Sequence, residues 1–234
     1  MKAFVLAAGL GTRLRPLTDR VPKCLVTVDG RPLLDLWLDA MEELGVDEVL
    51  VNVHHLAGQV RSHVAARRRG PRVTVSHEPV LLGSAGTLVA NREFVGADDV
   101  FLAVNGDDLT DFDVSLLVDA LEAQPSAEAA VAVFHAPRPE ACGIVEVTGG
   151  VMTSFEEKPR HPRSDLANAG MYAFRRSVLD VVPDRSPVDI GTDLLPLLVG
   201  RAVAVPVGDA FLLDIGTPEA LARAESEWPG RGVA

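Results

Sequence analysis

The feature that most constrains this chain is the passage from an apolar run into a glycine-containing, cationic loop near its start. The apolar residues 3–8 predict a buried strand, and Gly9 and Gly11 follow directly. Glycines permit positive φ and close approach of the backbone, so the N–H groups of such a loop can bind phosphate oxygens. Arg13 and Lys23 come soon after and supply positive charge. This order predicts a polyphosphate-binding loop at the end of a strand.

Two common glycine loops do not fit. A dinucleotide-binding fingerprint would place a third glycine where Leu14 stands, and the sequence contains no Gly-Lys pair for a Walker A loop. A nicotinamide-dependent dehydrogenase is disfavoured further because no clear ribose-binding acid lies near position 30. A plain turn with solvated arginines is the alternative interpretation of the loop.

The alternation of apolar runs with helical patterns predicts the fold class. Strands are expected at 2–8, 48–53, 72–76 and 100–105, and helices at 32–44, 56–69 and 84–94. This order predicts an α/β fold, a Rossmann-like, mostly parallel sheet with helices on both faces. Ligands of such sheets bind beyond the carboxyl ends of the strands, so the opening loop and Asn105-Gly106-Asp107 are expected in one site.

Short strands dominate after about residue 125 and predict a small antiparallel portion. These strands are expected at 129–134, 144–147, 152–155 and 170–174, with helices near 189–199 and 218–227. No linker or repeat divides the sequence, so a single domain over 1–234 is expected. Its parts are a first half (1–125), a second half (126–228) and a frayed tail (229–234).

Two aspartates follow apolar runs far apart in the sequence, Asp107 and Asp214. Carboxylates together with phosphate oxygens are the ligands that Mg²⁺ prefers. Each aspartate alone could be an ordinary turn residue, and Asp108 is an alternative to Asp107. Thr217 is expected to cap the helix that follows it.

The opening loop with Pro22-Lys23 resembles the signature of the sugar-1-phosphate nucleotidylyltransferases, also called nucleotide-sugar pyrophosphorylases. Further segments resemble that family's motifs and occur in its order: Asn105-Gly106-Asp107, Glu157-Lys158-Pro159, Asn168-Ala169-Gly170 and Asp214-Ile215-Gly216-Thr217-Pro218. The resemblance covers residues 1 to about 225. It implies the nucleotide-diphospho-sugar transferase fold, with a nucleotide-binding first half and a sugar-phosphate-binding second half. It also implies transfer of a nucleotidyl group from an NTP to a sugar 1-phosphate, with release of an NDP-sugar and pyrophosphate.

The same resemblance assigns roles to individual residues. The residues expected to bind the nucleotide are Leu6, Ala8, Gly9, Gly11, Thr12, Arg13, Glu78, Gly83 and Ser84. Those expected to bind the sugar 1-phosphate are Gly143, Glu157, Lys158 and Asn168. Arg13, Lys23 and Lys158 are expected to carry catalysis, and Asp107 and Asp214 to bind Mg²⁺ as cofactor.

The base and the sugar are less constrained. Glu78 could accept hydrogen bonds from guanine, and its surroundings most resemble mannose-1-phosphate guanylyltransferases among short bacterial members, which favours GTP with a mannose- or heptose-type 1-phosphate. UTP or dTTP stays open, because Asn105-Gly106-Asp107 also resembles bacterial N-acetylmuramate-1-phosphate uridylyltransferases. Ser84 could simply be a helix N-cap. Cys142 replaces the family's usual aromatic residue before Gly143, which leaves the sugar open.

Two further functions are weighed against this one. A phosphocholine-type cytidylyltransferase would not need a sugar-facing Asn168 and Glu157. A non-catalytic nucleotide-sugar sensor would be expected to have lost Lys23, Asp107 or Lys158, all of which are present.

Composition bounds the partners and the location. The net charge of −11 argues against nucleic acid and anionic membranes as partners. Cys24 and Cys142 are too few for a disulfide framework or a zinc site, and no apolar run reaches the roughly 20 residues of a membrane span, so a cytoplasmic protein is expected. The basic cluster Arg67-Arg68-Arg69 is interpreted as a solvated helix end. A homodimer is compatible with the sequence.

Overall fold

The computed structural model of the chain describes residues 1–228 and 230, so the expected tail at 229–234 lies outside the described residues apart from Gly230. The chain divides into two compact units. The first unit comprises residues 1–81, 104–112 and the described residues from 209 onward, and the second comprises 82–103 and 113–208. These boundaries differ from the division expected near residue 125, because residues 82–103 pack with the later part of the chain.

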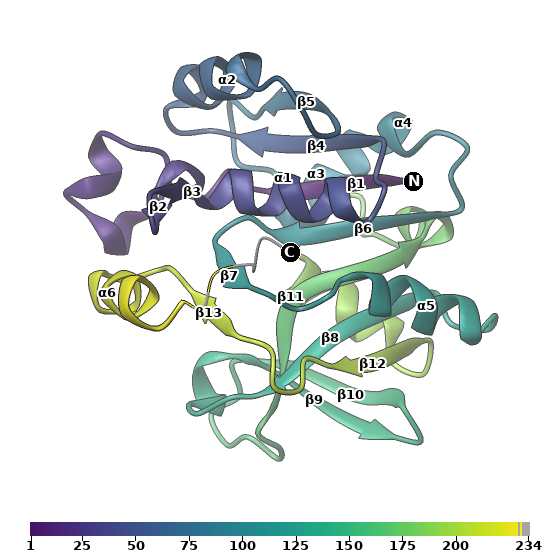
Figure 1. The fold of residues 1–234 in the computed structure, drawn as a ribbon. Helices are drawn as coiled ribbons and strands as arrows, with labels where there is room; N and C mark the ends of the chain where they lie inside the picture. The colour runs from purple at the N-terminus through teal and green to yellow at the C-terminus, as the bar shows by residue number, and fades with distance from the viewer. Residues whose placement is uncertain (229, 231–234) are drawn as a thin grey trace. The chain divides into compact units, whose positions relative to one another are not determined.

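The first unit contains the parallel βαβαβ arrangement that the sequence predicts. Its strands β1 (Lys2–Leu6), β4 (Glu48–Val53) and β5 (Arg72–His77) run parallel in the order β5-β4-β1. Helix α1 (Leu33–Glu43) connects β1 to β4 through a longer loop, and α2 (Ala57–Ala66) connects β4 to β5 (Figure 1). Long connections of this kind are what parallel pairing requires.

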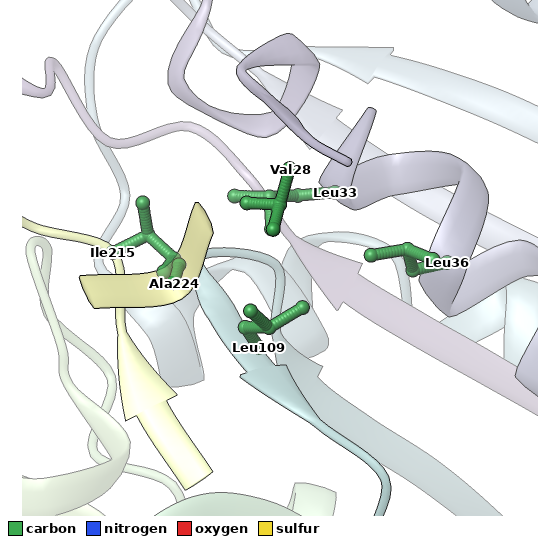
Figure 2. Close-up of a cluster of buried hydrophobic side chains, with 6 residues drawn as sticks. All are labelled: Val28, Leu33, Leu36, Leu109, Ile215 and Ala224. Carbon is green, nitrogen blue, oxygen red and sulfur yellow. The ribbon is translucent and has the colours of Figure 1, made fainter. Parts of the chain in front are cut away.

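Two antiparallel strand pairs complete the first unit together with helix α6 (Pro218–Glu227). These are β2 (Thr27–Val28) with β3 (Arg31–Pro32), and β7 (Asp108–Thr110) with β13 (Leu212–Asp214). Figure 2 shows the buried cluster behind them: Val28, Leu33, Leu36, Leu109, Ile215 and Ala224. Burial of each large aliphatic side chain stabilises the fold by roughly 1.5–3 kcal/mol. This cluster therefore fixes β7 and β13, and with them Asp107 and Asp214, against the start of α1.

The second unit contains the antiparallel portion that the sequence predicts, but the antiparallel pairings are too many for the sheet to be mostly parallel, so it is a mixed sheet. The strand order in this unit is β11-β8-β12-β10-β9, and among the pairings within it only β8 with β12 is parallel. The strands are β8 (Ala129–His135), β9 (Gly143–Thr148), β10 (Val151–Glu157), β11 (Leu166–Arg175) and β12 (Ala202–Pro206), and β6 (Val100–Asn105) begins in this unit. Hairpins replace helical crossovers here: Gly149 and Gly150 both have positive φ, as the two central residues of a type I′ turn require.

Two helix predictions in the second unit need correction, and one helix was missed. The single helix expected at 84–94 is interrupted at Asn91, giving α3 (Ser84–Ala90) and α4 (Arg92–Val95). The helix expected at 189–199 is a π-helix followed by a 3-10 helix, Ile190–Leu194 and Leu195–Leu198. Helix α5 (Ser115–Ala123) was not predicted. Pro196 lacks the N–H that a continuous α-helix would use, which accounts for the change of helix type at that point.

Two surface predictions have different outcomes. Thr217 caps α6 as expected, since its Oγ1 accepts from the N–H of Ala220 at 3.2 Å. The basic cluster is solvated only in part: Arg68 and Arg69 are exposed as expected, but Arg67 donates to Asp35 at 2.5 Å and to Asp39 at 2.8 Å, so it joins α2 to α1. No helix among the described residues is long and apolar enough to cross a membrane.

The two cysteines should differ in reactivity. Cys24 is buried, and burial raises the pKa of its thiol to about 12, whereas Cys142 is only partly buried. A thiol-exchange reagent at pH 8 should therefore label Cys142 in the native protein and both cysteines in denaturant. The variant Cys142→Ser should show no native labelling. Rapid labelling of that variant would show that Cys24 is accessible.

Candidate active site

The residues expected at the site divide between the two units. The first unit contains Leu6, Ala8, Gly9, Gly11, Thr12, Arg13, Lys23, Glu78, Asp107 and Asp214. The second unit contains Gly83, Ser84, Gly143, Glu157, Lys158 and Asn168.

The loop after β1 is shaped by Gly11. This residue has a φ of +62°, and a Cβ there would lie 2.8 Å from Cγ2 of Thr18. Thr18 also donates from Oγ1 to the carbonyl of Gly11 at 2.7 Å. From Thr12 onward the loop continues as three short 3-10 helices, Thr12–Leu14, Leu17–Asp19 and Lys23–Leu25. A Cβ at Gly9 would meet none of the described residues within 4 Å, so the loop is packed at Gly11 and open at Gly9.

Lys23 lies between the two aspartates that were expected to bind metal. Its Nζ is 2.5 Å from Oδ2 of Asp107 and 3.1 Å from Oδ1 of Asp214. The lysine side chain is only 8% exposed, while the two aspartates are 38% and 50% exposed. Burial opposes the charge of Lys23, but the two carboxylates outweigh burial and raise the pKa of the ammonium above its ordinary value. We refer to these three side chains as the ion triad.

Arg13 joins the ion triad through Asp214. Its guanidinium lies 3.4 Å from Oδ2 of Asp214, and it is largely exposed. Gly216 makes this approach possible, because a Cβ there would lie 2.6 Å from the guanidinium and 2.9 Å from both carboxylate oxygens of Asp214. Sequence reasoning gave Gly216 no role, although it lies in the motif formed by residues 214–218.

Asp108, the alternative metal ligand, has a different environment from Asp107. It lies at the start of β7, where its backbone carbonyl accepts from the indole N–H of Trp37 at 2.9 Å. Burial, with the charges of Asp107 and Asp214, raises the pKa of its carboxyl well above the usual range. Asp107 has the ammonium of Lys23 as a direct partner, so it is the better candidate for an ionised ligand.

The ion triad allows the expected magnesium site to be tested against the residues present. Among residues 1–228 and 230, no group of three or more His, Cys, Asp or Glu side chains could hold a metal ion by themselves. Two carboxylates nevertheless converge on a single positive charge, the Lys23 ammonium. Mg²⁺ is commonly bound by one or two carboxylates plus substrate phosphates, so Asp107 and Asp214 fit a cation of that kind.

Glu78 is connected to the start of the loop after β1 through Asn52, a residue that sequence reasoning missed. Glu78 is 3% exposed, and its Oε1 accepts from Nδ2 of Asn52 at 2.9 Å. The Oδ1 of Asn52 in turn accepts from the N–H of Ala7 at 2.7 Å, directly after β1. The available signal was a polar residue near the carboxyl end of the apolar strand 48–53. The Nδ1 of His54, directly after β4, lies 2.7 Å from the carbonyl of Glu78.

In the second unit, Glu157 lies between two glycines. A Cβ at Gly143 would lie 2.6 Å from Oε2 of Glu157, and a Cβ at Gly191 would lie 2.8 Å from the same atom. Lys158 follows with a φ of +48°, and its Nζ is 3.5 Å from Oε1 of Glu157. The ring of Phe155 also lies against Gly143. Sequence reasoning assigned no role to Gly191, because only the folded chain brings it to Glu157, and none to Phe155, whose contact with Gly143 likewise depends on the fold.

The side chain of Asn168 is engaged within its own strand. Its Nδ2 donates to the hydroxyl of Tyr172 at 2.7 Å, and its Oδ1 accepts from the N–H of Gly170 at 3.1 Å. The pairing of β11 with β8 shifts register between Asn168 and Tyr172. The expected contact of Asn168 with a sugar stays a prediction.

Cys142 packs against a small apolar cluster that includes Ile144.

Ser84 is not the N-cap of α3, which corrects the alternative interpretation of this residue. Gly83 occupies the cap position, and no side chain caps the helix. The Oγ of Ser84 instead accepts from the N–H of Ile190 at 2.7 Å and lies 3.3 Å from Oδ1 of Asp189. Its partners are therefore more than a hundred residues away in the sequence.

Comparison with known proteins supports the resemblance seen in the sequence. Residues 2–229 match the family described as nucleotidyl transferase. A UTP--glucose-1-phosphate uridylyltransferase of Synechocystis sp. is 34% identical over 215 residues, which cover 85% of this chain and 55% of that protein. The mannose-1-phosphate guanylyltransferase catalytic subunit beta of Xenopus tropicalis is 33% identical over 226 residues (94% and 62%). A glucose-1-phosphate thymidylyltransferase of Streptomyces griseus is 34% identical over 228 residues (92% and 62%). The chain thus spans 55–62% of the length of these relatives.

Two solved structures share the fold. One is a Bacillus anthracis protein described as a candidate glucose-1-phosphate thymidylyltransferase, in complex with sucrose. Its TM-score is 0.83 at 23% identity, covering 97% of this chain and 94% of that one. The other is HddC from Yersinia pseudotuberculosis complexed with GMP-PN, with a TM-score of 0.78 at 22% identity (96% and 98%). At these identities the likeness shows the fold alone.

Replacement of Lys23 should destabilise the protein. Lys23→Met leaves Asp107 and Asp214 without the ammonium between them, with only the exposed Arg13 still paired to Asp214, and we expect the free energy of unfolding to fall by about 1–3 kcal/mol. The loss is moderated because both carboxylates still reach water. Lys158→Met is the matched control: its ammonium is largely exposed, so its loss should cost less than about 0.5 kcal/mol.

The Lys23 effect should also depend on pH. A raised folded-state pKa means that the stabilisation is complete below the unfolded-state value of about 10.4 and is lost as the pH rises through the folded-state value. Urea unfolding of wild type and Lys23→Met should therefore differ equally at pH 7 and 9 and converge at higher pH. Equal stability of the two proteins at pH 7 would contradict a stabilising ion triad.

Proposed function

This chain belongs to the nucleotidyl transferase family, and from that premise we propose that it transfers a nucleotidyl group from an NTP to a sugar 1-phosphate. The observation that carries the proposal is the ion triad beside the glycine loop: two carboxylates from distant segments converge on Lys23, with Arg13 bound to one of them. This combination provides both the negative charge to bind a divalent cation and the positive charge to bind a polyphosphate.

The proposed reaction is attack of a phosphate oxygen of the sugar 1-phosphate on the α-phosphorus of the NTP. The new O–P bond forms as the bond to the β-phosphate oxygen breaks, and pyrophosphate leaves with that electron pair. The nucleophile is ionised near pH 7, so no general base is needed, and catalysis consists of alignment and charge neutralisation. In this proposal Arg13 and Lys23 neutralise the departing pyrophosphate, and Lys158 binds the phosphate of the nucleophile.

The remaining residues have supporting roles in the proposal. Asp107 and Asp214 would hold Mg²⁺, which when bound neutralises charge on the phosphate oxygens. The backbone around Gly9 and Gly11 binds the polyphosphate, because the loop is open at Gly9. Glu157 accepts hydrogen bonds from sugar hydroxyls.

For the substrates we propose GTP with a mannose- or heptose-type 1-phosphate. The sequence around Glu78 supports guanine, and a guanylyltransferase is among the relatives. Relatives with uridylyl- and thymidylyltransferase names are equally similar, so UTP or dTTP is the alternative. The burial of Glu78 against Asn52 suggests that any effect on base choice also involves the strand end at Ala7.

The test is pyrophosphate release from the pure protein with Mg²⁺, each of ATP, CTP, GTP, UTP and dTTP, and a panel of sugar 1-phosphates. We expect release with GTP and a manno-configured sugar phosphate. Release only with UTP or dTTP would support the proposed reaction but contradict the proposed preference for guanine. If the protein binds nucleotide sugars but releases no pyrophosphate with any combination of substrates, it is a non-catalytic sensor and not an enzyme.

Removal of either triad carboxylate should abolish turnover. We expect Asp107→Ala and Asp214→Asn to lower kcat/KM by about 100-fold or more, because charge on the phosphates is left uncompensated. Asp47→Asn is the matched control: Asp47 lies in the same unit but binds the N-terminal ammonium, so its rate should stay near that of wild type. Circular dichroism checks the fold. A near-normal rate for Asp107→Ala would remove this residue from the mechanism.

A further inference from the structure

Within the second unit, the loop Leu82–Gly86 is joined to the distant segment Val188–Gly191. Two backbone hydrogen bonds of 2.9 Å form the base of the contact, from Val188 N–H to the Leu82 carbonyl and from Gly86 N–H to the Val188 carbonyl. Ser84 adds a reciprocal pair, donating its N–H to Oδ1 of Asp189 at 3.1 Å and accepting at Oγ from Ile190 N–H at 2.7 Å.

The contact between these two segments is close and fixed. Gly83 has a φ of +80°, and a Cβ there would collide with the backbone of Val188. Val188 and Ile190 are buried. The N–H of Asp189 donates to Oδ2 of Asp193 at 2.8 Å, and Asp193 also pairs with Arg185. The segment therefore has little freedom to move independently of the loop.

The other end of the same segment lies against the sugar-site carboxylate. Gly191 follows Ile190 directly, and a Cβ on it would lie 2.8 Å from Oε2 and 3.4 Å from Cδ of Glu157. Gly143 bounds the same carboxylate from β9. Any displacement of Gly191 would therefore change the space available to Glu157.

We propose that residues 188–191 form a positioning element that couples the loop at 83–86 to Glu157, with Ser84 and Asp189 as its positioning residues. The inference rests on the proposed function in that the loop is taken to bind the nucleotide and Glu157 the sugar phosphate. Occupancy of the loop then raises the affinity for the sugar phosphate, and the sugar phosphate raises the affinity for the nucleotide by the same factor.

Kinetics of matched variants test this coupling. Ser84→Ala removes the acceptor for Ile190 and should raise the KM for the sugar 1-phosphate about 3- to 10-fold, the range for loss of one neutral hydrogen bond. Ser84→Thr keeps the hydroxyl, so its KM for the sugar 1-phosphate should stay close to that of wild type. Asp189→Asn should raise this KM less than Asp189→Ala does. Gly191→Ala should raise the sugar KM while leaving the NTP KM within about twofold. A Ser84→Ala variant in which only the NTP KM rises would overturn the proposal.

Hydrogen exchange of the ligand-free protein separates this inference from the proposed function. Ser84→Ala should speed exchange in peptides covering both 188–194 and 155–158, whereas 48–53 in the first unit should be unchanged. If wild type makes no NDP-sugar with any substrate, the proposed function fails while the exchange result still decides the coupling. If exchange becomes faster at 188–194 but is unchanged at 155–158, the segment does not position Glu157.

Discussion

The ion triad is the interaction on which the first unit's site depends. Asp107 and Asp214 bring two carboxylates together beside the Asp108 carboxyl, and like charges about 4 Å apart repel by about 4 kcal/mol at the effective dielectric near a protein surface. The Lys23 ammonium compensates this repulsion, and the carboxylates in turn offset the cost of burying Lys23. The lysine and the two aspartates therefore stabilise one another in this arrangement.

Apolar packing and missing Cβ atoms give the ion triad its geometry. Leu109 and Ile215 follow Asp107 and Asp214 closely and are buried in one cluster, so the two carboxylates are fixed by side chains two and one residues beyond them (Figure 2). The N–H of Ile215 donates to the carbonyl of Asp107 at 3.0 Å, which joins the two segments directly. Gly216 then leaves the space in which Arg13 reaches Asp214. The site is thus a product of the core beneath it.

Sequence reasoning predicted what local patterns encode and missed what distant contacts decide. Alternating apolar and helical periods predicted the parallel strands of the first unit. The partners of Ser84, in contrast, are Asp189 and Ile190, so local propensity could offer only a helix cap as the alternative to nucleotide binding. Asn52 and Gly191 were missed for the same reason, since their roles depend on Glu78 and Glu157, which only the folded chain brings near.

The triad also determines what an incoming polyphosphate must displace. Lys23 and Arg13 are both paired with Asp214, and the chain as a whole carries a net charge of −11. A phosphate therefore gains these cations only in competition with a carboxylate of the same unit. A divalent cation on Asp107 and Asp214 would reduce that competition, because the carboxylates would no longer need the ammonium as counter-ion. Under the proposed function, metal and polyphosphate are therefore expected to bind this unit cooperatively, in a chain that is acidic overall.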